Sequence, residues 1–243
     1  MSARAVVLVH GAWMDAGCWD RVRGLLAAQG DDVRAVNLPG HGADQTSLSA
    51  LSLDAYVDAV IAALPDGAPA LLVGHSMAGM VISAVAERVP HRVSGLLYLA
   101  AYLPQSGESL YQISQTDADS VVPRYWRQDD PAAYSPAYID AAGIVEVFAA
   151  DASPADQAQL VASHRAEALG PLGTPVSLTA ERWGRVPRAY IHTTRDRAVS
   201  YALQQRMVAA APGTTVLATL ETSHVPMLTA PDAVVVAIRG WRP

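Results

Sequence analysis

The stretch Gly74-His75-Ser76-Met77-Ala78-Gly79 decides how this chain of 243 residues is interpreted. It follows an apolar run at residues 70–73 and precedes a helical pattern at residues 77–88. A serine between a strand and a helix, flanked by small residues, is typical of the nucleophile elbow G-x-S-x-G. Ala78 stands where the second glycine of that pattern belongs. We expect a functional elbow that tolerates the Ala78 methyl group, and an ordinary α/β turn of small residues is the alternative.

Short apolar runs alternate with amphipathic patterns along the chain, which predicts a parallel sheet covered by helices. Strands buried on both faces are expected at residues 5–10, 33–37, 70–74, 95–100, 188–192 and 214–218. Helices are expected at residues 19–29, 53–64, 77–88 and 231–239. Residues 104–180 interrupt the alternation with prolines, tyrosines and polar stretches. The sequence therefore predicts an α/β core of residues 1–103 and 181–243, with a cap of short helices inserted at residues 104–180.

Composition disfavours several classes of chemistry. The formal net charge is −6 and there is no basic run, which argues against a nucleic-acid partner. All 17 basic residues are arginine, so no catalytic lysine is available. Cys18 is the only cysteine, so an internal disulfide is excluded. No cluster of metal ligands is visible, and we expect neither a metal nor an organic cofactor.

The apolar runs are too short for membrane insertion. None approaches the roughly 18 residues that a spanning helix needs. The first residues lead directly into an expected strand and do not resemble a signal peptide. We therefore expect a cytoplasmic protein without a membrane partner.

A serine nucleophile needs a histidine base that a carboxylate orients. In serine hydrolases built on a parallel sheet, the chain order is serine, acid, histidine. Asp196 is the only acid in the loop after residues 188–192, and His224 follows the last expected strand. A surface ion pair for Asp196 and a solvated position for His224 are the alternatives. Because Ser76, Asp196 and His224 all follow strands whose carboxyl ends share one edge of the sheet, we predict that they form a catalytic triad.

Acyl transfer also needs backbone amides that hold the oxyanion. The N–H group of Met77, directly after the serine, is the first expected donor. The loop after the first strand reads His10-Gly11-Ala12-Trp13, and the N–H group of Ala12 is the second. A simple turn at the end of the strand is the alternative for Gly11.

Three aromatic side chains are candidates for lining the substrate pocket. They are Trp13 in the first loop and Tyr125 and Trp126 in the insertion. Packing without substrate contact is the alternative for the two residues of the insertion.

Four segments together resemble the α/β-hydrolase superfamily: residues 7–13, residues 38–42, the elbow, and residues 223–227. More narrowly they look like the branch of plant methylesterases and hydroxynitrile lyases, with their bacterial esterase relatives. The resemblance covers residues 4–103 and 181–240 and is vague over the insertion. It implies an α/β-hydrolase fold with a mostly parallel six-stranded sheet, and it suggests a homodimer. It also implies Ser76 as nucleophile, His224 as base, Asp196 as orienting acid, and oxyanion donors at Ala12 and Met77.

Two positions depart from the lyases of this branch. Lyases related to the rubber-tree enzyme carry threonine at the position of Gly11 and lysine directly after the catalytic histidine, where this chain has Val225. That lysine stabilises departing cyanide, and this chain contains none. The pattern of an esterase is therefore favoured over cyanohydrin cleavage.

The sequence thus predicts a serine hydrolase that cleaves a small or medium carboxylic ester through an acyl-enzyme. A lyase or cyclase-type tailoring enzyme that uses the same pocket without an acyl-enzyme is one alternative. A non-catalytic protein that binds a small molecule is the other.

Overall fold

Six strands form one sheet in the order β2-β1-β3-β4-β7-β8. Every pairing between neighbours in this sheet is parallel. The computed structural model describes residues 4–243, and residues 1–3, which the predicted core range includes, lie outside the described residues. The predicted α/β fold with a six-stranded sheet is confirmed. The strands are β1 Ala5–Val9, β2 Asp32–Val36, β3 Ala70–His75, β4 Val93–Leu99, β7 Arg188–Thr193 and β8 Thr214–Leu220.

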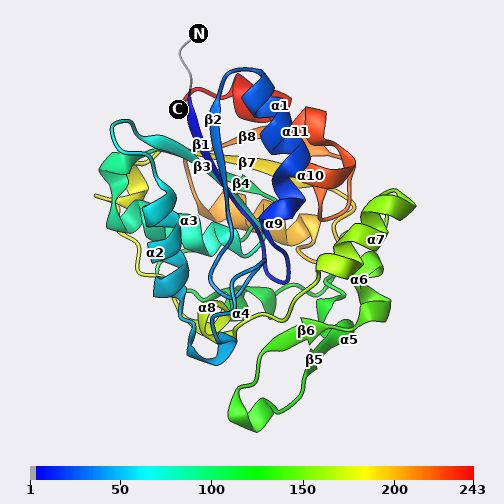
Figure 1. The fold of residues 1–243 in the computed structure, drawn as a ribbon. Coiled ribbons are helices and arrows are strands. Elements are labelled where there is room, and N and C mark those ends of the chain that lie inside the picture. Colours follow the sequence, from blue (N-terminus) through cyan, green and yellow to red (C-terminus); the bar gives the residue numbers. More distant parts are fainter. Residues whose placement is uncertain (1–3) are drawn as a thin grey trace.

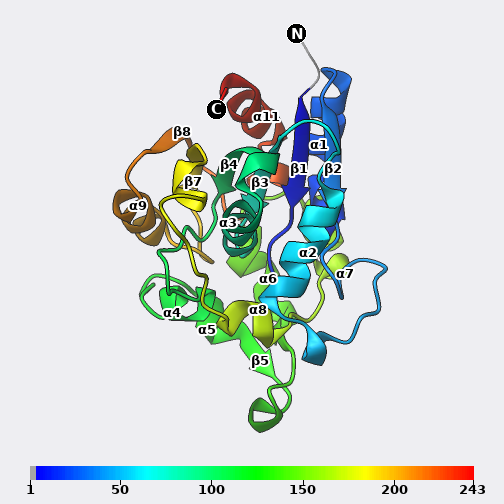
Figure 2. The same cartoon turned by 90° about the vertical axis from the view of Figure 1, so that its left-hand side faces the viewer.

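Helices cover both faces of the sheet, as Figures 1 and 2 show. Helices α1 and α11 pack together on one face, and α2 and α3 pack together on the other. The four predicted helices are present, and the hydroxyl of Ser52 caps the start of α2 by accepting a hydrogen bond from the amide of Ala55. None of the helices within residues 4–243 is long and apolar enough to cross a membrane. The helices around the sheet are α1 Asp20–Ala28, α2 Leu53–Ala63, α3 Ala78–Arg88, α9 Tyr201–Ala210, α10 Pro226–Thr229 and α11 Pro231–Gly240.

Central and edge strands differ in burial. Strands β3 and β7 are buried along their whole length, as the continuous apolar runs predict. The prediction of burial on both faces is wrong for β2 and β8, in which exposed residues such as Asp32 and Val216 occur. These two strands lie at the edges of the sheet, where one side has no neighbouring strand.

The chain between β4 and β7 leaves the sheet and forms the lower part of Figure 1, beyond the ends at which the parallel strands terminate. Short helices are present there, and a two-stranded antiparallel ribbon, β5–β6, is an addition that the sequence did not predict. The division into core and cap at residues 104 and 180 stays a prediction. The elements are α4 Leu110–Ser114, α5 Val122–Tyr125, β5 Trp126–Gln128, β6 Ala137–Ile139, α6 Ala141–Phe148, α7 Pro154–Ser163 and α8 Leu169–Gly173.

Helix α3 begins where the chain after β4 passes very close to it. A Cβ atom at Gly79 would lie 1.9 Å from the carbonyl oxygen of Tyr102. That oxygen belongs to the backbone, so it cannot move away as a flexible side chain would. Position 79 therefore requires glycine for steric reasons.

We predict that Gly79→Ala lowers the free energy of unfolding by at least about 2–3 kcal/mol, because overpacking against backbone forces the elbow to shift. Gly24→Ala is the matched control, since Gly24 lies inside α1 with no atom within 4 Å of the added methyl group. The control should gain about 0.5–1 kcal/mol from helix propensity. Urea unfolding of both variants measures the difference, and equal stability would contradict the steric argument.

Candidate active site

Ser76 occupies a strained turn between β3 and α3. Its φ angle is +55°, in the left-handed region that non-glycine residues rarely adopt. Three backbone hydrogen bonds hold it there: its N–H donates to Leu99 at 3.3 Å, and its carbonyl oxygen accepts from Gly79 at 3.1 Å and Tyr102 at 3.0 Å. This is the geometry of a nucleophile elbow, which directs the side chain away from both flanking elements.

Close packing around the elbow explains which neighbours are small. A Cβ atom at Gly11 would lie 2.7 Å from the Cβ atom of Ser76, and one at Gly74 would lie 2.8 Å from the carbonyl oxygen of Ala78. Ala78 itself is fully buried at the first position of α3. Its methyl group is therefore accommodated in the fold, as the sequence interpretation expects.

Asp196 and His224, which are 28 residues apart, are in direct contact. The Nδ1 atom of His224 donates to Oδ2 of Asp196 at 2.7 Å. Both side chains are almost completely buried. Because a carboxylate only accepts hydrogen bonds, this contact places the proton of a neutral imidazole on Nδ1 and leaves the lone pair on Nε2. Within residues 4–243, Nε2 of His224 has no hydrogen-bond partner.

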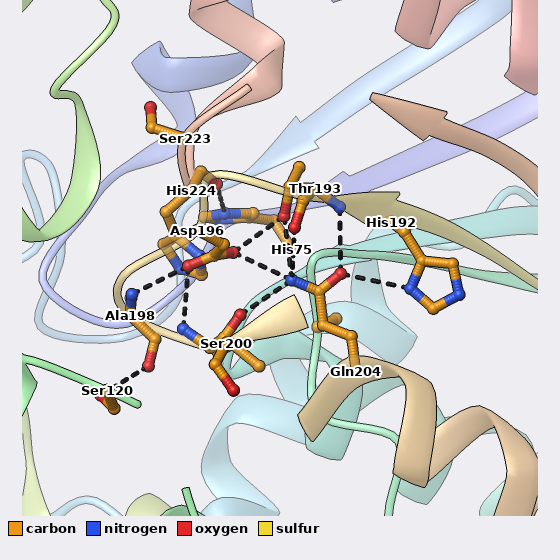
Figure 3. Close-up of polar contacts among 12 residues, drawn as sticks. His75, Ser120, His192, Thr193, Asp196, Ala198, Ser200, Gln204, Ser223 and His224 are labelled. Atoms are coloured by element: carbon orange, nitrogen blue, oxygen red, sulfur yellow. Dashed lines mark hydrogen bonds and ion pairs between the residues drawn. The ribbon is translucent and has the colours of Figure 1, made fainter. Parts of the chain in front are cut away.

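The other acceptor sites of Asp196 are occupied by donors from the end of β7, from the same loop and from α9 (Figure 3). Oδ1 accepts from the amides of Ala198 at 2.8 Å and Val199 at 2.9 Å. Oδ2 also accepts from the hydroxyl of Thr193 at 2.9 Å and from Nε2 of Gln204 at 3.2 Å. A buried carboxylate is stable only with such partners, and here they also hold it in one orientation toward His224.

His75 connects the elbow to the loop of His224. Its Nε2 atom donates to the carbonyl oxygen of His224 at 2.8 Å, and the two rings lie 4.6 Å apart. Burial lowers the pKa of His75 far below its usual value, and the neighbouring His224 lowers it further. Neutral His75, the residue before Ser76, therefore holds the loop of His224 next to the elbow.

One predicted oxyanion donor, Met77, follows Ser76 directly, and the other, Ala12, follows Gly11, whose backbone lies against Ser76. Among the residues that the structure describes, the amides of Ala12 and Met77 have no hydrogen-bond acceptor. Ala12, Met77 and Ser76 all line one cavity. Two free N–H groups next to a serine are what an oxyanion hole requires.

The cavity has a volume of about 250 Å³ and lies under the elements of the insertion. Trp13 and Trp126 line it as expected, whereas Tyr125 lies outside the lining and its hydroxyl donates to Glu146 on α6. None of the lining side chains carries a charge. They are Ala12, Trp13, Ser76, Met77, Tyr102, Leu110, Tyr111, Ser114, Gln115, Ser120, Val122, Pro123, Trp126, Phe148, Leu172, Ala198 and Val199.

Sequence reasoning missed the groups that support these residues. His10 precedes the serine and His75 adjoins it, so the order serine, acid, histidine assigns neither a role, yet both hold loops of the site in place. His10 donates from Nδ1 to the carbonyl oxygen of Gly11 at 2.8 Å and accepts at Nε2 from the amide of Leu38 at 3.1 Å. Their signal in the sequence is a position at or directly after the end of an expected strand.

A family model described as the alpha/beta hydrolase family matches residues 6–238. The chain belongs to this family. It is 29% identical over 242 residues to methylesterase 2 of Arabidopsis thaliana, which covers 93% of this chain and 91% of the relative. It is also 29% identical over 253 residues to a pyrethroid hydrolase of Sphingobium wenxiniae, in an alignment that covers 99% of this chain and 88% of the relative. The crystal structure of a pyrethroid hydrolase from Sphingobium faniae superposes with a TM-score of 0.84 at 28% identity, over 98% of this chain and 97% of that one. Similarity to a plant methylesterase and to bacterial pyrethroid hydrolases agrees with the branch that the sequence resembles.

The histidines of this fold make its stability depend on pH. Burial lowers the pKa of His10 to about 3 and that of His164 to about 4, and the pKa values of His75 and His192 are lowered for the same reason. In the unfolded chain these groups titrate near about 6.5, so below that pH the unfolded state binds protons that the folded state does not. His41 acts in the opposite direction. Its pKa is raised, so protonated His41 stabilises the fold at low pH, and this contribution is lost as the pH rises.

We predict that the free energy of unfolding falls as the pH is lowered from about 7 to 5. Each buried neutral histidine contributes about 1.4 kcal/mol per pH unit below its unfolded pKa, so a total loss of at least about 2 kcal/mol is expected. Urea unfolding at pH 7, 6 and 5 measures it. A stability that is constant over this range, with a loss only where carboxylates protonate, would contradict the prediction.

Proposed function

We propose that the enzyme hydrolyses a small or medium carboxylic ester through an acyl-enzyme on Ser76. The observation that carries this proposal is the hydrogen bond that His224 donates to Asp196, next to an elbow that holds Ser76 at a φ angle of +55°. The chain is an ester-cleaving α/β hydrolase, as its similarity to methylesterases and a pyrethroid hydrolase supports. The three side chains are thereby assigned as nucleophile, base and orienting acid.

Acylation begins when the Oγ atom of Ser76 attacks the carbonyl carbon of the ester. Nε2 of His224 accepts the hydroxyl proton, and Asp196 stabilises the imidazolium that forms. The amides of Ala12 and Met77 donate to the negative oxygen of the tetrahedral intermediate. The intermediate collapses, the bond to the alcohol oxygen breaks, and His224 returns the proton to the leaving alcohol.

Deacylation repeats these steps with water. His224 removes a proton from the water molecule that attacks the acyl carbon, and the same amides hold the second oxyanion. Collapse of this intermediate breaks the bond to Ser76, which recovers its proton from His224. The products are one carboxylic acid and one alcohol, and no cofactor takes part.

The uncharged lining of the cavity indicates the class of ester. A charged group on the substrate would be buried there without an opposite charge, which is unfavourable by several kcal/mol. Aromatic and aliphatic side chains such as Trp126 and Phe148 instead suit an apolar acyl or alcohol group. We therefore propose neutral, largely apolar esters as substrates. The homodimer that the resemblance suggests stays a prediction.

We predict that a fluorophosphonate labels Ser76 and that Ser76→Ala lowers kcat by at least about 10⁴-fold without a loss of folding. Mass spectrometry locates the label, and initial rates on an aryl ester give kcat. Ser94→Ala is the matched control, because its hydroxyl is buried in β4 and does not line the cavity. Labelling with no turnover of any ester would favour a lyase, and an unlabelled Ser76 would favour a binding protein.

We predict that methyl pentanoate is hydrolysed with a kcat/KM at least about 10²-fold higher than monomethyl succinate at pH 7.5. The two esters are similar in length, but the second carries a carboxylate that the cavity cannot pair. Titration of the released acid gives both rates. Equal rates would show that the acyl chain extends into solvent instead of into the cavity.

A further inference from the structure

A fully buried carboxylate in the insertion contacts the loop that carries the oxyanion donor Ala12. Glu167 has no exposed surface and lies between α7 and α8. Its Oε2 atom accepts a hydrogen bond from the amide of Trp13 at 3.3 Å. We propose that Glu167 is a positioning residue that fixes this loop, so that the amide of Ala12 is aimed at the oxyanion. This inference rests on the proposed function and deepens it.

Trp13 needs such a support because its backbone is strained. Its φ angle is +64°, which for a tryptophan costs about 1–3 kcal/mol unless its surroundings hold it. The indole Nε1 atom donates to the carbonyl oxygen of Ala137 at 3.1 Å, and the carbonyl oxygen of Trp13 accepts from the amide of Arg165 at 3.1 Å. Together with Glu167, these contacts hold the amide, the carbonyl group and the side chain of Trp13 from the insertion.

The same segment of the insertion holds Glu167 in place. Its amide donates to the carbonyl oxygen of Ala137 at 2.7 Å, and its carbonyl oxygen accepts from the amide of Ala137 at 2.9 Å. This pair extends the β5–β6 ribbon by one bridge. The position of Glu167 is therefore set by backbone hydrogen bonds and not by its side chain alone.

Donors from the core surround the rest of the carboxylate. The hydroxyl of Tyr56 donates to Oε1 at 2.6 Å, and Nε2 of His41 lies 3.1 Å from Oε2. Burial acts to lower the pKa of His41, but the hydrogen bond to Glu167 and its charge outweigh burial, and the pKa is raised. The amide of Ala168 donates to Oε1 at 2.9 Å. Every group that faces the two oxygens is thus a donor, which suits an ionised carboxylate.

This arrangement links the loop of Ala12 to α2 and to the His41 loop through one side chain. The amide of Ala12 belongs to the peptide immediately before that of Trp13, so a shift of Trp13 also moves the oxyanion donor. A misplacement of about 1 Å at a reacting group lowers the rate by about 10²-fold. Glu167 does not line the cavity itself and acts through Trp13, which does.

Glu167→Gln tests the proposal, because the amide keeps the length of the side chain but replaces one acceptor oxygen with a donor. We expect kcat for a neutral ester to fall by about tenfold to 10²-fold with KM changed by less than about threefold. Asp156→Asn is the matched control. Asp156 is a buried carboxylate on α7 that joins the insertion to Arg21 of the core without contacting Trp13. Its variant should keep kcat within about twofold.

A pair of inhibitors separates positioning from a general loss of structure. A trifluoromethyl ketone adds to the Oγ atom of Ser76 and places an oxyanion in the hole, while the corresponding alcohol has the same shape and cannot add. Glu167→Gln should raise the inhibition constant of the ketone by at least about tenfold and leave that of the alcohol within about twofold. An equal change for both inhibitors would overturn the proposal.

Glu167→Asp provides a second variant in case the amide prevents folding. It keeps the charge for His41 but is one methylene shorter, so it cannot reach Tyr56, His41 and the amide of Trp13 together. The same selective loss of kcat is expected. If both Glu167 variants match Asp156→Asn in kcat, the positioning role is wrong although the wild-type enzyme labels at Ser76 and turns over. If the wild-type enzyme does not label, the proposed function itself fails.

Discussion

The strained backbone of Ser76 is the constraint on which the rest of the site depends. A left-handed conformation at a non-glycine residue costs about 1–2 kcal/mol. The hydrogen bonds from Ser76 to Leu99, and from Gly79 and Tyr102 to Ser76, offset that cost with backbone groups of β4, the loop after β4, and α3. Because Leu99, Gly79 and Tyr102 are all buried, Ser76 cannot relax without disturbing the core. The strain thus keeps the nucleophile at the edge where the strands end.

Two buried carboxylates then fix the groups that act with Ser76. Asp196 is held by donors from the end of β7, from its own loop and from α9. Glu167 comes from the insertion and reaches across to the loop after β1. An unpaired buried charge is strongly unfavourable, so each carboxylate stabilises the fold only while its partners stay in place. In our proposal one carboxylate orients the base, and the other positions an oxyanion donor.

The two carboxylates also differ in how far the sequence predicts them. Asp196 follows an apolar run that reads as a strand, and the edge rule for parallel sheets places it beside Ser76 and His224. Glu167 stands in a stretch, Arg165-Ala166-Glu167-Ala168, that shows no strand or helix period. Its contact with Trp13 spans 154 residues and depends on how the insertion folds. Tyr125 shows the same limit, since nothing in its neighbourhood in the sequence indicates that its hydroxyl turns toward Glu146.

The alanine in the elbow is explained by the packing around α3. A glycine in a motif is required where a Cβ atom would meet backbone that cannot move; this holds for Gly74, which lies against the carbonyl oxygen of Ala78, and most strictly for Gly79. The obstacle is the carbonyl oxygen of Tyr102, whose own amide donates to Ser76 at 3.0 Å. One residue of the loop after β4 therefore both holds the nucleophile and excludes a side chain from position 79. The methyl group of Ala78 is buried without disturbing this contact, so the departure from G-x-S-x-G leaves the geometry of the elbow intact.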